Sequence, residues 1–262
     1  MAGGPAFHRQ RTRTGVTATQ LIDIVFPGAT NHHGTLFGGV GLAHMDKVAF
    51  IAATRHAHVD FVTASCERID FKAPAHPGDL VEVTGTVVRA GRRSLGVEVA
   101  LVAEAPLSGE RRLSSRGVFN MVAVGPAADG ADWRMPALAG PPEPAAGDRM
   151  VELVFPGETS HYGSLYGGHT MAAMAKAAFI AATRHSRRTL VMASVQRVDF
   201  TATVEAGAII ELAPVVTATG RRSLTVEVTL HAESPRSGER RLCGSGTFVM
   251  VAVDAAGGSA SS

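Results

Sequence analysis

Two features in one apolar stretch of the chain could take part in chemistry. Gly38 and Gly39 precede a run rich in Ala, Met, Val and Ile, and Asp46 lies within that run. Paired glycines at the start of a helix let a ligand approach the backbone, and the free N–H groups there stabilise negative charge. A carboxylate in an apolar helix is costly unless it is solvated or used. Asp46 is therefore a candidate base, next to a candidate oxyanion site.

Each feature also has a structural interpretation, and the spacing between them limits the functional one. The glycine pair could allow close packing of the helix on a sheet, and Asp46 could lie at a solvated helix edge beside Lys47. Eight helical residues place Gly38 and Asp46 about 12 Å apart along one axis. The two therefore cannot act on the same atom, and a site that uses both features needs a second helix.

A second helix of the same kind is expected because the chain contains an internal repeat. Val25-Phe-Pro-Gly28 recurs as Val154-Phe-Pro-Gly157, and the match continues at an offset of 129 residues to Val124 and Val253. A unit of about 100 residues is too long for a solenoid repeat and indicates a duplicated domain. The predicted organisation is a disordered segment at 1–18, a first domain at 19–125, a Pro/Gly/Ala-rich linker at 126–148, a second domain at 149–254 and a disordered tail at 255–262.

Each repeat is predicted to contain one buried helix followed by strands. The residues from Leu36 to His56 are apolar on nearly all sides, which favours a buried helix. Runs with turn signals between them predict strands at 21–26, 61–71, 80–89, 94–104 and 111–124. The fold class is therefore α+β, with two tandem domains packed as an internal pseudo-dimer. If their helices pack antiparallel, Asp46 comes beside Gly167 and Gly168, and a shared site lies between the domains.

Composition excludes several classes of protein. The chain has 262 residues, 45% of them hydrophobic, and a formal net charge of +2, so wholesale disorder and nucleic-acid binding are not expected. No stretch of about 20 apolar residues predicts a membrane helix, and no membrane partner is expected. Cys66 and Cys243 do not form a disulfide framework. We expect a soluble cytoplasmic protein.

The histidines suggest a different chemistry, which the rest of the sequence does not support. His32, His33, His44 and His161 lie near the candidate site, but no Cys or carboxylate completes a metal-ligand set. A Gly-x-Ser-x-Gly nucleophile elbow is absent from the sequence. We therefore expect no metal, and we expect His161 to line the pocket as a polar contact.

A series of motifs runs through the first repeat. They are Asn31-x-x-Gly34-x-x-x-Gly38-Gly39, Met45-Asp46, Val62-Thr-Ala-Ser65, Phe71-x-x-Pro74, Gly78-Asp79 and Gly91-Arg-Arg-Ser94. Together they resemble the hotdog-fold acyl-CoA thioesterases, and most closely the cytosolic acyl-CoA hydrolases with tandem hotdog domains. The resemblance covers nearly all of both repeats. It implies hydrolysis of acyl-CoA to a fatty acid and CoA, no cofactor other than the CoA of the substrate, and self-association into trimers of double-hotdog chains.

The resemblance also implies roles for individual residues. An Asn and a glycine N–H at the helix start hold the thioester carbonyl, and they correspond here to Asn31 and Gly38. An Asp from the facing domain activates water with the help of a hydroxyl, and these correspond to Asp46 and Thr63.

The second repeat departs from this pattern. Ser160, Ala175 and Met192 stand at the positions of Asn31, Asp46 and Thr63, whereas Gly167 and Gly168 are kept. The single site expected to be active joins Asp46 and Thr63 to Ser160, His161 and Gly167, with a hydroxyl in place of the Asn amide. Two alternatives stay open. First repeats of two chains could pair to give a complete Asn31–Asp46 site, or the protein could bind acyl-CoA without hydrolysing it.

Arginine pairs recur at turns in both repeats. Arg92-Arg93-Ser94 and Arg221-Arg222-Ser223 each follow a glycine at a predicted hairpin turn. They are either solvated cations or contacts for the phosphates of CoA, since the Arg fork suits phosphate oxygens. The pairs Arg111-Arg112 and Arg240-Arg241 follow a Ser-Gly turn and are expected to be solvated turn charges.

Overall fold

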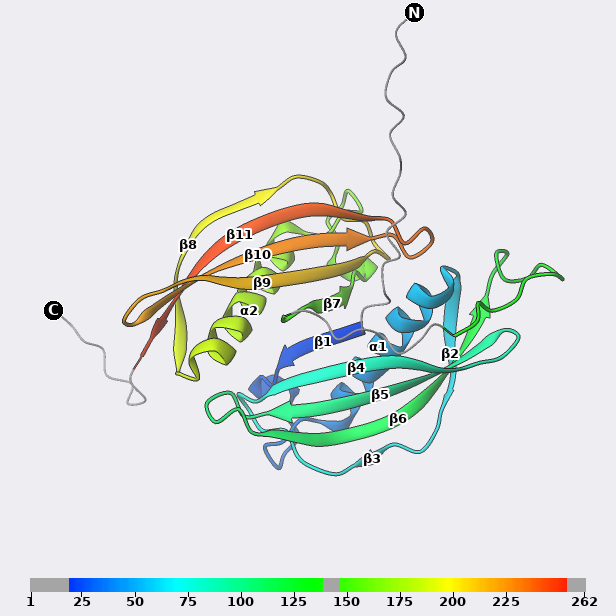
Figure 1. The fold of residues 1–262 in the computed structure, drawn as a ribbon, viewed down its shortest axis with the longest axis horizontal. Helices are drawn as coiled ribbons and strands as arrows, with labels where there is room; N and C mark the ends of the chain where they lie inside the picture. The colour runs from blue at the N-terminus through cyan, green and yellow to red at the C-terminus, as the bar shows by residue number, and fades with distance from the viewer. Residues whose placement is uncertain (1–18, 139–146, 254–262) are drawn as a thin grey trace, which may run out of the picture.

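The computed structural model describes residues 19–138 and 147–253. The disorder predicted for 1–18 and 255–262 lies outside these residues, as does the central part of the predicted linker. Within them, each repeat folds into one long helix packed against an antiparallel sheet (Figure 1). The predicted α+β class with two such domains is confirmed. Neither described helix is both long and apolar enough to cross a membrane.

The first domain has the strand order β1-β4-β5-β6-β2, with the short β3 also paired to β6. Its elements are β1 (Thr19–Ile24), η1 (Pro27–Ala29), α1 (Gly38–Ala57), β2 (Asp60–Cys66), β3 (Asp70–Phe71), β4 (Leu80–Ala90), β5 (Ser94–Glu104) and β6 (Arg111–Val124).

The second domain repeats this plan in the order β7-β9-β10-β11-β8. Its elements are β7 (Met150–Leu153), η2 (Pro156–Glu158), α2 (Gly167–Ser186), β8 (Leu190–Phe200), β9 (Ile209–Thr219), β10 (Ser223–Glu233) and β11 (Arg240–Ala252).

The helix of the first domain presents small and larger apolar residues on the side that meets the sheet. Met45, Val48 and Ile51 are fully buried against it. The helix begins after Phe37, whose backbone is extended, and ends at His58, which adopts the left-handed conformation. The predicted span, Leu36 to His56, therefore differs from the observed one by only one or two residues.

The strand predicted at 61–71 is divided in the first domain but continuous in the second. β2 ends at Cys66 and β3 resumes at Asp70, whereas β8 runs unbroken from Leu190 to Phe200. Between β2 and β3, the side chain of Ile69 occupies the space where Gly117 has no Cβ. This inserted side chain accompanies the break in pairing.

The two domains meet through β1 and β7, which lie side by side in the middle of the molecule (Figure 1). Their cores interlock at this contact. Ile22 of β1 packs in the core of the second domain, and Val151 of β7 packs in the core of the first. The helices α1 and α2 do not pack along each other; α1 packs instead on β7. The antiparallel helix pair considered above is therefore not formed within the chain.

Two groups of ion pairs flank this contact. On α2, Arg184 contacts Glu104 at 2.7 Å, Glu82 at 2.8 Å and Asp148 at 2.6 Å. On α1, the equivalent Arg55 contacts Glu233 at 2.7 Å. Each arginine thus binds carboxylates of the other domain's sheet, and only 1% of the Glu104 side chain is exposed.

The second arginine pairs do not behave as predicted. Arg111 contacts Glu82 at 2.6 Å and Glu104 at 2.8 Å, and Arg240 contacts Glu211 at 2.6 Å. The prediction that these arginines are solvated turn charges is therefore wrong in part: the side chains of Arg111 and Arg240 are 43% and 39% exposed, but each is paired with a largely buried carboxylate. The sequence showed the turn beside them but not the acidic residues that β4 and β9 bring within reach.

Candidate active site

Asp46 and Thr63 lie together, as predicted. Thr63 Oγ1 on β2 donates a hydrogen bond of 2.6 Å to Asp46 Oδ1 on α1. Both side chains line an open cavity of about 400 Å³, whose other walls come from Leu42 and Ala43 on α1, residues 64–66 of β2 and Phe119. A carboxylate whose orientation is fixed at the edge of an open cavity can accept a proton from a water molecule there.

Asp46 is oriented away from the in-chain domain contact. The next residue, Lys47, forms an ion pair of 2.7 Å with Glu152 on β7, so this side of α1 faces the second domain. Asp46 stands about 100° around the helix from Lys47 and bonds to β2, at the opposite edge of the sheet from β1.

Asn31 and Gly38 line a separate cavity of about 310 Å³ at the start of α1, together with Phe71 and Ser114. The amide of Asn31 is engaged in its own turn. Its oxygen accepts the N–H groups of His33 at 2.9 Å and Thr35 at 3.3 Å, and Nδ2 donates to the Thr35 hydroxyl at 3.0 Å. Asn31 therefore shapes the loop that leads into the helix.

The second domain repeats this loop with a smaller side chain. The Ser160 hydroxyl accepts the Tyr162 N–H at 3.3 Å and lies 3.4 Å from the Ser164 hydroxyl, in the place of the Asn31 bonds. His161 is exposed and stacks on Tyr162, with ring centroids 3.9 Å apart. Gly167 and Phe200 line a cavity of about 400 Å³ that matches the one at Gly38.

The predicted residues thus form separate groups within one chain. The cavity at Asp46 is lined by residues of the first domain, and those at Gly38 and Gly167 contain neither Asp46 nor Thr63. Gly39 and Gly168 follow the first helical residues, where an added Cβ would collide with the rings of Phe37 and Tyr166 at 2.6 Å. A side chain at either position would therefore displace the neighbouring ring.

A model of the thioesterase superfamily matches residues 33–109 and 162–239. These two segments contain both helices and the strands β2 to β5 and β8 to β10. The chain belongs to the thioesterase superfamily.

Two relatives of this thioesterase are similar over most of its length, and a third over 38% of it. A crystal structure of an acyl-CoA hydrolase from Agrobacterium tumefaciens is 49% identical, with a TM-score of 0.84 over 91% of this chain and 96% of that one. A cytosolic acyl coenzyme A thioester hydrolase of Rattus norvegicus is 25% identical over 281 residues, covering 89% of this chain and 74% of the rat protein. An uncharacterized acyl-CoA thioester hydrolase of Bacillus subtilis is 38% identical over 100 residues, or 58% of its length.

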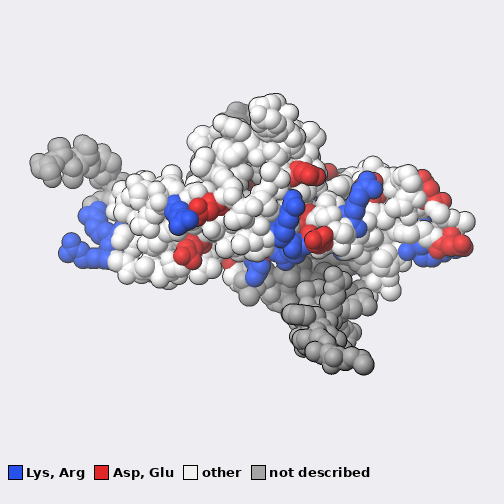
Figure 2. All heavy atoms as spheres, turned by 90° about the horizontal axis from the view of Figure 1, so that it is seen from above, with Lys and Arg blue, Asp and Glu red and all other residues white. Residues whose placement is uncertain are grey.

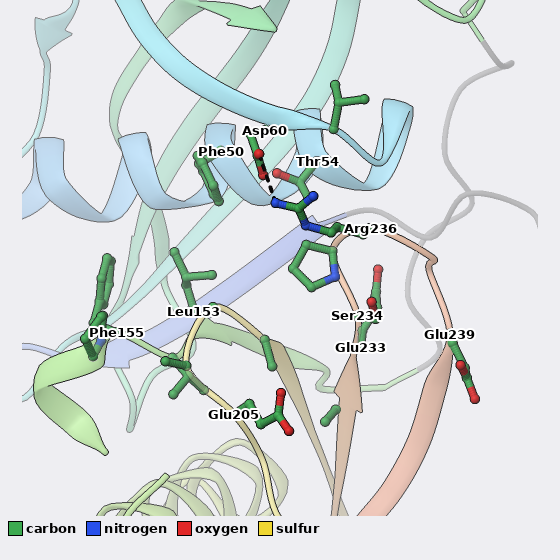
Figure 3. Close-up of a pocket in the computed structure, with 18 of the residues that line it drawn as sticks. Phe50, Thr54, Asp60, Leu153, Phe155, Glu205, Glu233, Ser234, Arg236 and Glu239 are labelled. Atoms are coloured by element: carbon green, nitrogen blue, oxygen red, sulfur yellow. Dashed lines mark hydrogen bonds and ion pairs between the residues drawn. The ribbon is translucent and has the colours of Figure 1, made fainter. Parts of the chain in front are cut away.

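A further cavity of the thioesterase, about 740 Å³, lies between its domains and contains none of the predicted site residues (Figure 3). Phe50 and Thr54 of α1 line one side, and Phe155 lines the other. Arg236 reaches across it to Asp60, with a contact of 3.2 Å. This cavity was not predicted, because no pattern in the sequence indicates that the segments forming its two walls lie together.

Several arginines at the β4–β5 and β9–β10 turns of the thioesterase form contacts within the chain. Arg93 pairs with Asp129 at 2.7 Å, and Arg92 donates to the Ala131 carbonyl at 3.4 Å. The Arg222 guanidinium donates to the Ala252 carbonyl at 3.2 Å. In both turns the serine hydroxyl, of Ser94 or Ser223, packs where a Cβ on the preceding glycine would lie. The predicted phosphate contacts stay a prediction.

The charged residues of the domain contact were missed by the sequence analysis, although a signal was present. Glu82 and Glu211 interrupt otherwise apolar strands at equivalent positions of the two repeats. Burial alone would raise the pKa of Glu82 and Glu211, but hydrogen bonds and charges from the neighbouring arginines outweigh it and hold each pKa below its usual value. The carboxylates therefore stay ionised inside the contact.

Within the described residues, no group of three or more His, Cys, Asp or Glu side chains is arranged to hold a metal ion. His44 lies beside the domain contact, 3.9 Å from Asp23. Burial lowers its pKa despite the Asp23 carboxylate. Its imidazole is therefore neutral at pH 7.

Proposed function

We propose that this thioesterase hydrolyses acyl-CoA thioesters to a free fatty acid and CoA by direct attack of water. The observation that carries the proposal is the Thr63–Asp46 hydrogen bond at an open cavity. Similarity to the Agrobacterium acyl-CoA hydrolase over nearly its whole length supports the substrate class. As a cytosolic enzyme it would meet acyl-CoA in solution.

In the proposed reaction Asp46 acts as general base. It takes a proton as the water oxygen bonds to the thioester carbonyl carbon, and Thr63 keeps the carboxylate oriented. The C–S bond then breaks, and the proton passes from Asp46 to the departing CoA sulfur. No metal and no covalent acyl-enzyme are required.

The developing oxyanion is assigned to the start of α2. The Gly167 N–H donates to it, with the Ser160 hydroxyl and His161 as polar contacts. The first N–H groups of a helix lack intrahelical partners and favour negative charge, which suits this role. The start of α1, with Asn31, Gly38 and Gly39, keeps the same backbone form. The site paired with it lacks a base, because Ala175 and Met192 replace Asp46 and Thr63.

The phosphates of CoA are assigned to the arginine turns and their serines, Ser94 and Ser223. Arg221 and Arg222 lie at the β9–β10 turn, and Arg92 and Arg93 at the β4–β5 turn. The assembly proposed for the enzyme is a ring of three chains.

The second candidate function is acyl-CoA binding without hydrolysis. The observation behind it is that neither start of a helix shares a cavity with Asp46 inside one chain. A protein that never brings these groups together would bind the thioester and leave it intact.

A thiol-release assay over acyl-CoAs of increasing chain length tests the proposal. Asp46→Ala should lose about 10²- to 10⁴-fold in rate, as expected for a general base. Ser160→Ala should be impaired and Asn31→Ala nearly normal. Loss of activity in Asn31→Ala equal to that of Asp46→Ala would contradict the assignment of the oxyanion site. Binding of acyl-CoA with no turnover by the native chain would establish the second candidate.

A further inference from the structure

One arginine of the second domain lines the inter-domain cavity without a carboxylate partner. Arg241 on β11 is part of the wall of this cavity of about 740 Å³. Its guanidinium donates a hydrogen bond of 2.7 Å to the Thr203 carbonyl. Among the residues that the structure describes, no Asp or Glu side chain forms an ion pair with it.

The internal repeat shows how the equivalent arginine is bound in the first domain. Arg112 stands at the position of Arg241 and contacts Asp79 at 2.8 Å. Asp79 is only 7% exposed, and it also accepts the His76 N–H at 2.9 Å. One buried carboxylate thus joins the guanidinium to a backbone donor.

The second domain has no carboxylate at this position. Ala208 stands in the place of Asp79, and Glu205 in the place of His76. A methyl group cannot accept a hydrogen bond from Arg241 or from the Glu205 N–H. Ala208 and Arg241 line the same cavity. The cavity therefore contains an arginine where the first domain neutralises one.

The backbone of this loop is the same in both domains, so the difference is confined to the side chain. In each domain the residue at this position donates its N–H to the carbonyl three residues earlier, at 2.9 Å for Asp79 and 3.2 Å for Ala208. The preceding glycine has a positive φ in both loops, 88° at Gly78 and 82° at Gly207. An acceptor placed beside Arg241 would therefore meet the same two donors that bind Asp79.

Other charged side chains of the cavity already have partners. Asp60 contacts Arg236 at 3.2 Å, and Glu233 contacts Arg55 at 2.7 Å. Figure 2 shows the same pattern more widely, with several acidic side chains next to basic ones on the face that it presents. Arg241 differs from these arginines because its printed partner is a neutral carbonyl.

Two further carboxylates of the cavity, Glu205 and Glu239, are exposed to solvent. Glu239 corresponds to Glu110, which lies 3.7 Å from Arg112 while Arg112 also binds Asp79. The first domain therefore already holds an anion beside this arginine with a glutamate nearby. The equivalent glutamate of the second domain does not prevent an anion from binding there.

The remaining wall of the cavity is largely apolar. Phe50 on α1, Leu153 on β7 and Phe155 line it from the two domains, and Phe155 is 46% exposed (Figure 3). Its volume lies in the range of small-molecule sites, which are mostly apolar, contain a few polar groups and often lie between domains. An occupant that matches this wall has an apolar body and one carboxylate.

We propose that the inter-domain cavity binds a monocarboxylate with an apolar chain, the class to which fatty acids belong. The carboxylate takes the place that Asp79 fills in the first domain and accepts hydrogen bonds from Arg241 and the Glu205 N–H, while the chain lies against the apolar wall. This cavity shares no residue with the one at Asp46. Binding here does not depend on the proposed hydrolysis, although the proposed product belongs to the same class.

Calorimetric titration with fatty acids below their micelle concentration tests the proposal. The native chain should bind decanoate more tightly than hexanoate, by about fourfold for each added CH₂ group that becomes buried. Decanol has the same chain without the charge and should bind at least about tenfold more weakly than decanoate. Absence of saturable decanoate binding, or equal affinity for decanol, would contradict the proposal.

Ala208→Asp is the most specific variant, because the first domain provides its template. The new carboxylate should bind Arg241 as Asp79 binds Arg112, and so exclude the ligand, with a loss of at least about tenfold in decanoate affinity. Ala208→Ser is the matched control, since it is small and neutral and should bind decanoate as the native chain does. Unchanged affinity in Ala208→Asp would place the fatty acid elsewhere and overturn the proposal.

Arg241→Gln provides an independent variant. It removes the charge but keeps an amide donor for the Thr203 carbonyl, and circular dichroism checks that it folds. Its decanoate affinity should fall at least about tenfold, and native affinity would exclude Arg241 as the carboxylate ligand. Binding is measured without turnover. Absence of thiol release by the native chain would therefore contradict the proposed function and leave this site standing.

Discussion

Thr63 donates a 2.6 Å hydrogen bond to Asp46 and so ties the first strand after the helix to the middle of the helix. The equivalent positions in the second domain hold Met192 and Ala175, which cannot form this bond. The base and its orienting hydroxyl are therefore present or absent as a unit. This is the behaviour expected of two residues that serve one task.

The orienting role of Thr63 predicts a difference between two substitutions. Thr63→Val keeps the shape but removes the donor, and kcat should fall by about tenfold, the effect of losing one hydrogen bond to a charged group. Thr63→Ser keeps the hydroxyl and should retain most of the activity. Steady-state thiol release measures both, and equal activity of the two variants would show that the hydroxyl has no role.

The ion pairs of Arg184 predict a large loss of stability. Arg184→Ala leaves the buried Glu104 and Glu82 with fewer positive partners, and the free energy of unfolding should fall by about 3 kcal/mol. Arg197→Ala removes an ion pair with Asp199 that is exposed to solvent and should leave the stability unchanged. Urea unfolding followed by circular dichroism compares them, and equal midpoints would contradict a stabilising role for the network.

The same carboxylates predict acid sensitivity. Burial would raise the pKa of Glu82 and Glu104, but their arginine partners hold it below the usual 4.5 in the folded chain. A group whose folded pKa is lowered contributes its full stabilisation above the unfolded pKa and loses it as the pH falls through the folded value. The free energy of unfolding should therefore decline below about pH 4.5. The decline should be shallower in Glu104→Gln, and an identical pH profile would exclude Glu104 as a contributor.

The exposed edge of β2 predicts a change in assembly. Val62→Lys places a charge on the edge strand, and both the mass of the assembly and its activity should fall. Val215→Lys is the control, because Val215 is 58% exposed but lies on β9, inside the sheet order. Size-exclusion chromatography with light scattering measures the mass. An unchanged mass for Val62→Lys would place the contact between chains elsewhere.

Much of the fold could be predicted because its signals are local. The apolar run that became α1 and the turn signals between the strands report the conformation of neighbouring residues. Because the sequence is duplicated, the same signals predict the same elements in the second domain. The division between β2 and β3 could not be predicted from the local sequence. It accompanies the packing of Ile69 against Gly117, which lies on β6, far along the chain.

The relation between the domains could not be predicted in the same way. Both edges of each sheet are apolar in sequence, and periodicity does not say which edge meets which. The structure uses β1 and β7 and leaves β2 and β8 free. The pairing of Asp46 with Thr63 was expected from the family resemblance. The residues that complete their site could not be predicted in this way, because they depend on which sheet edges join.

The interlocked cores have a consequence for the independence of the two domains. Ile22 and Leu80 fill the interior of the second domain, and Val151 and Ile209 fill that of the first. Each half therefore lacks part of its own interior when separated from the other. A protease cut in the connecting segment should leave two fragments that stay associated and melt in one transition, so the duplicated gene product behaves as one folding unit made of two similar halves.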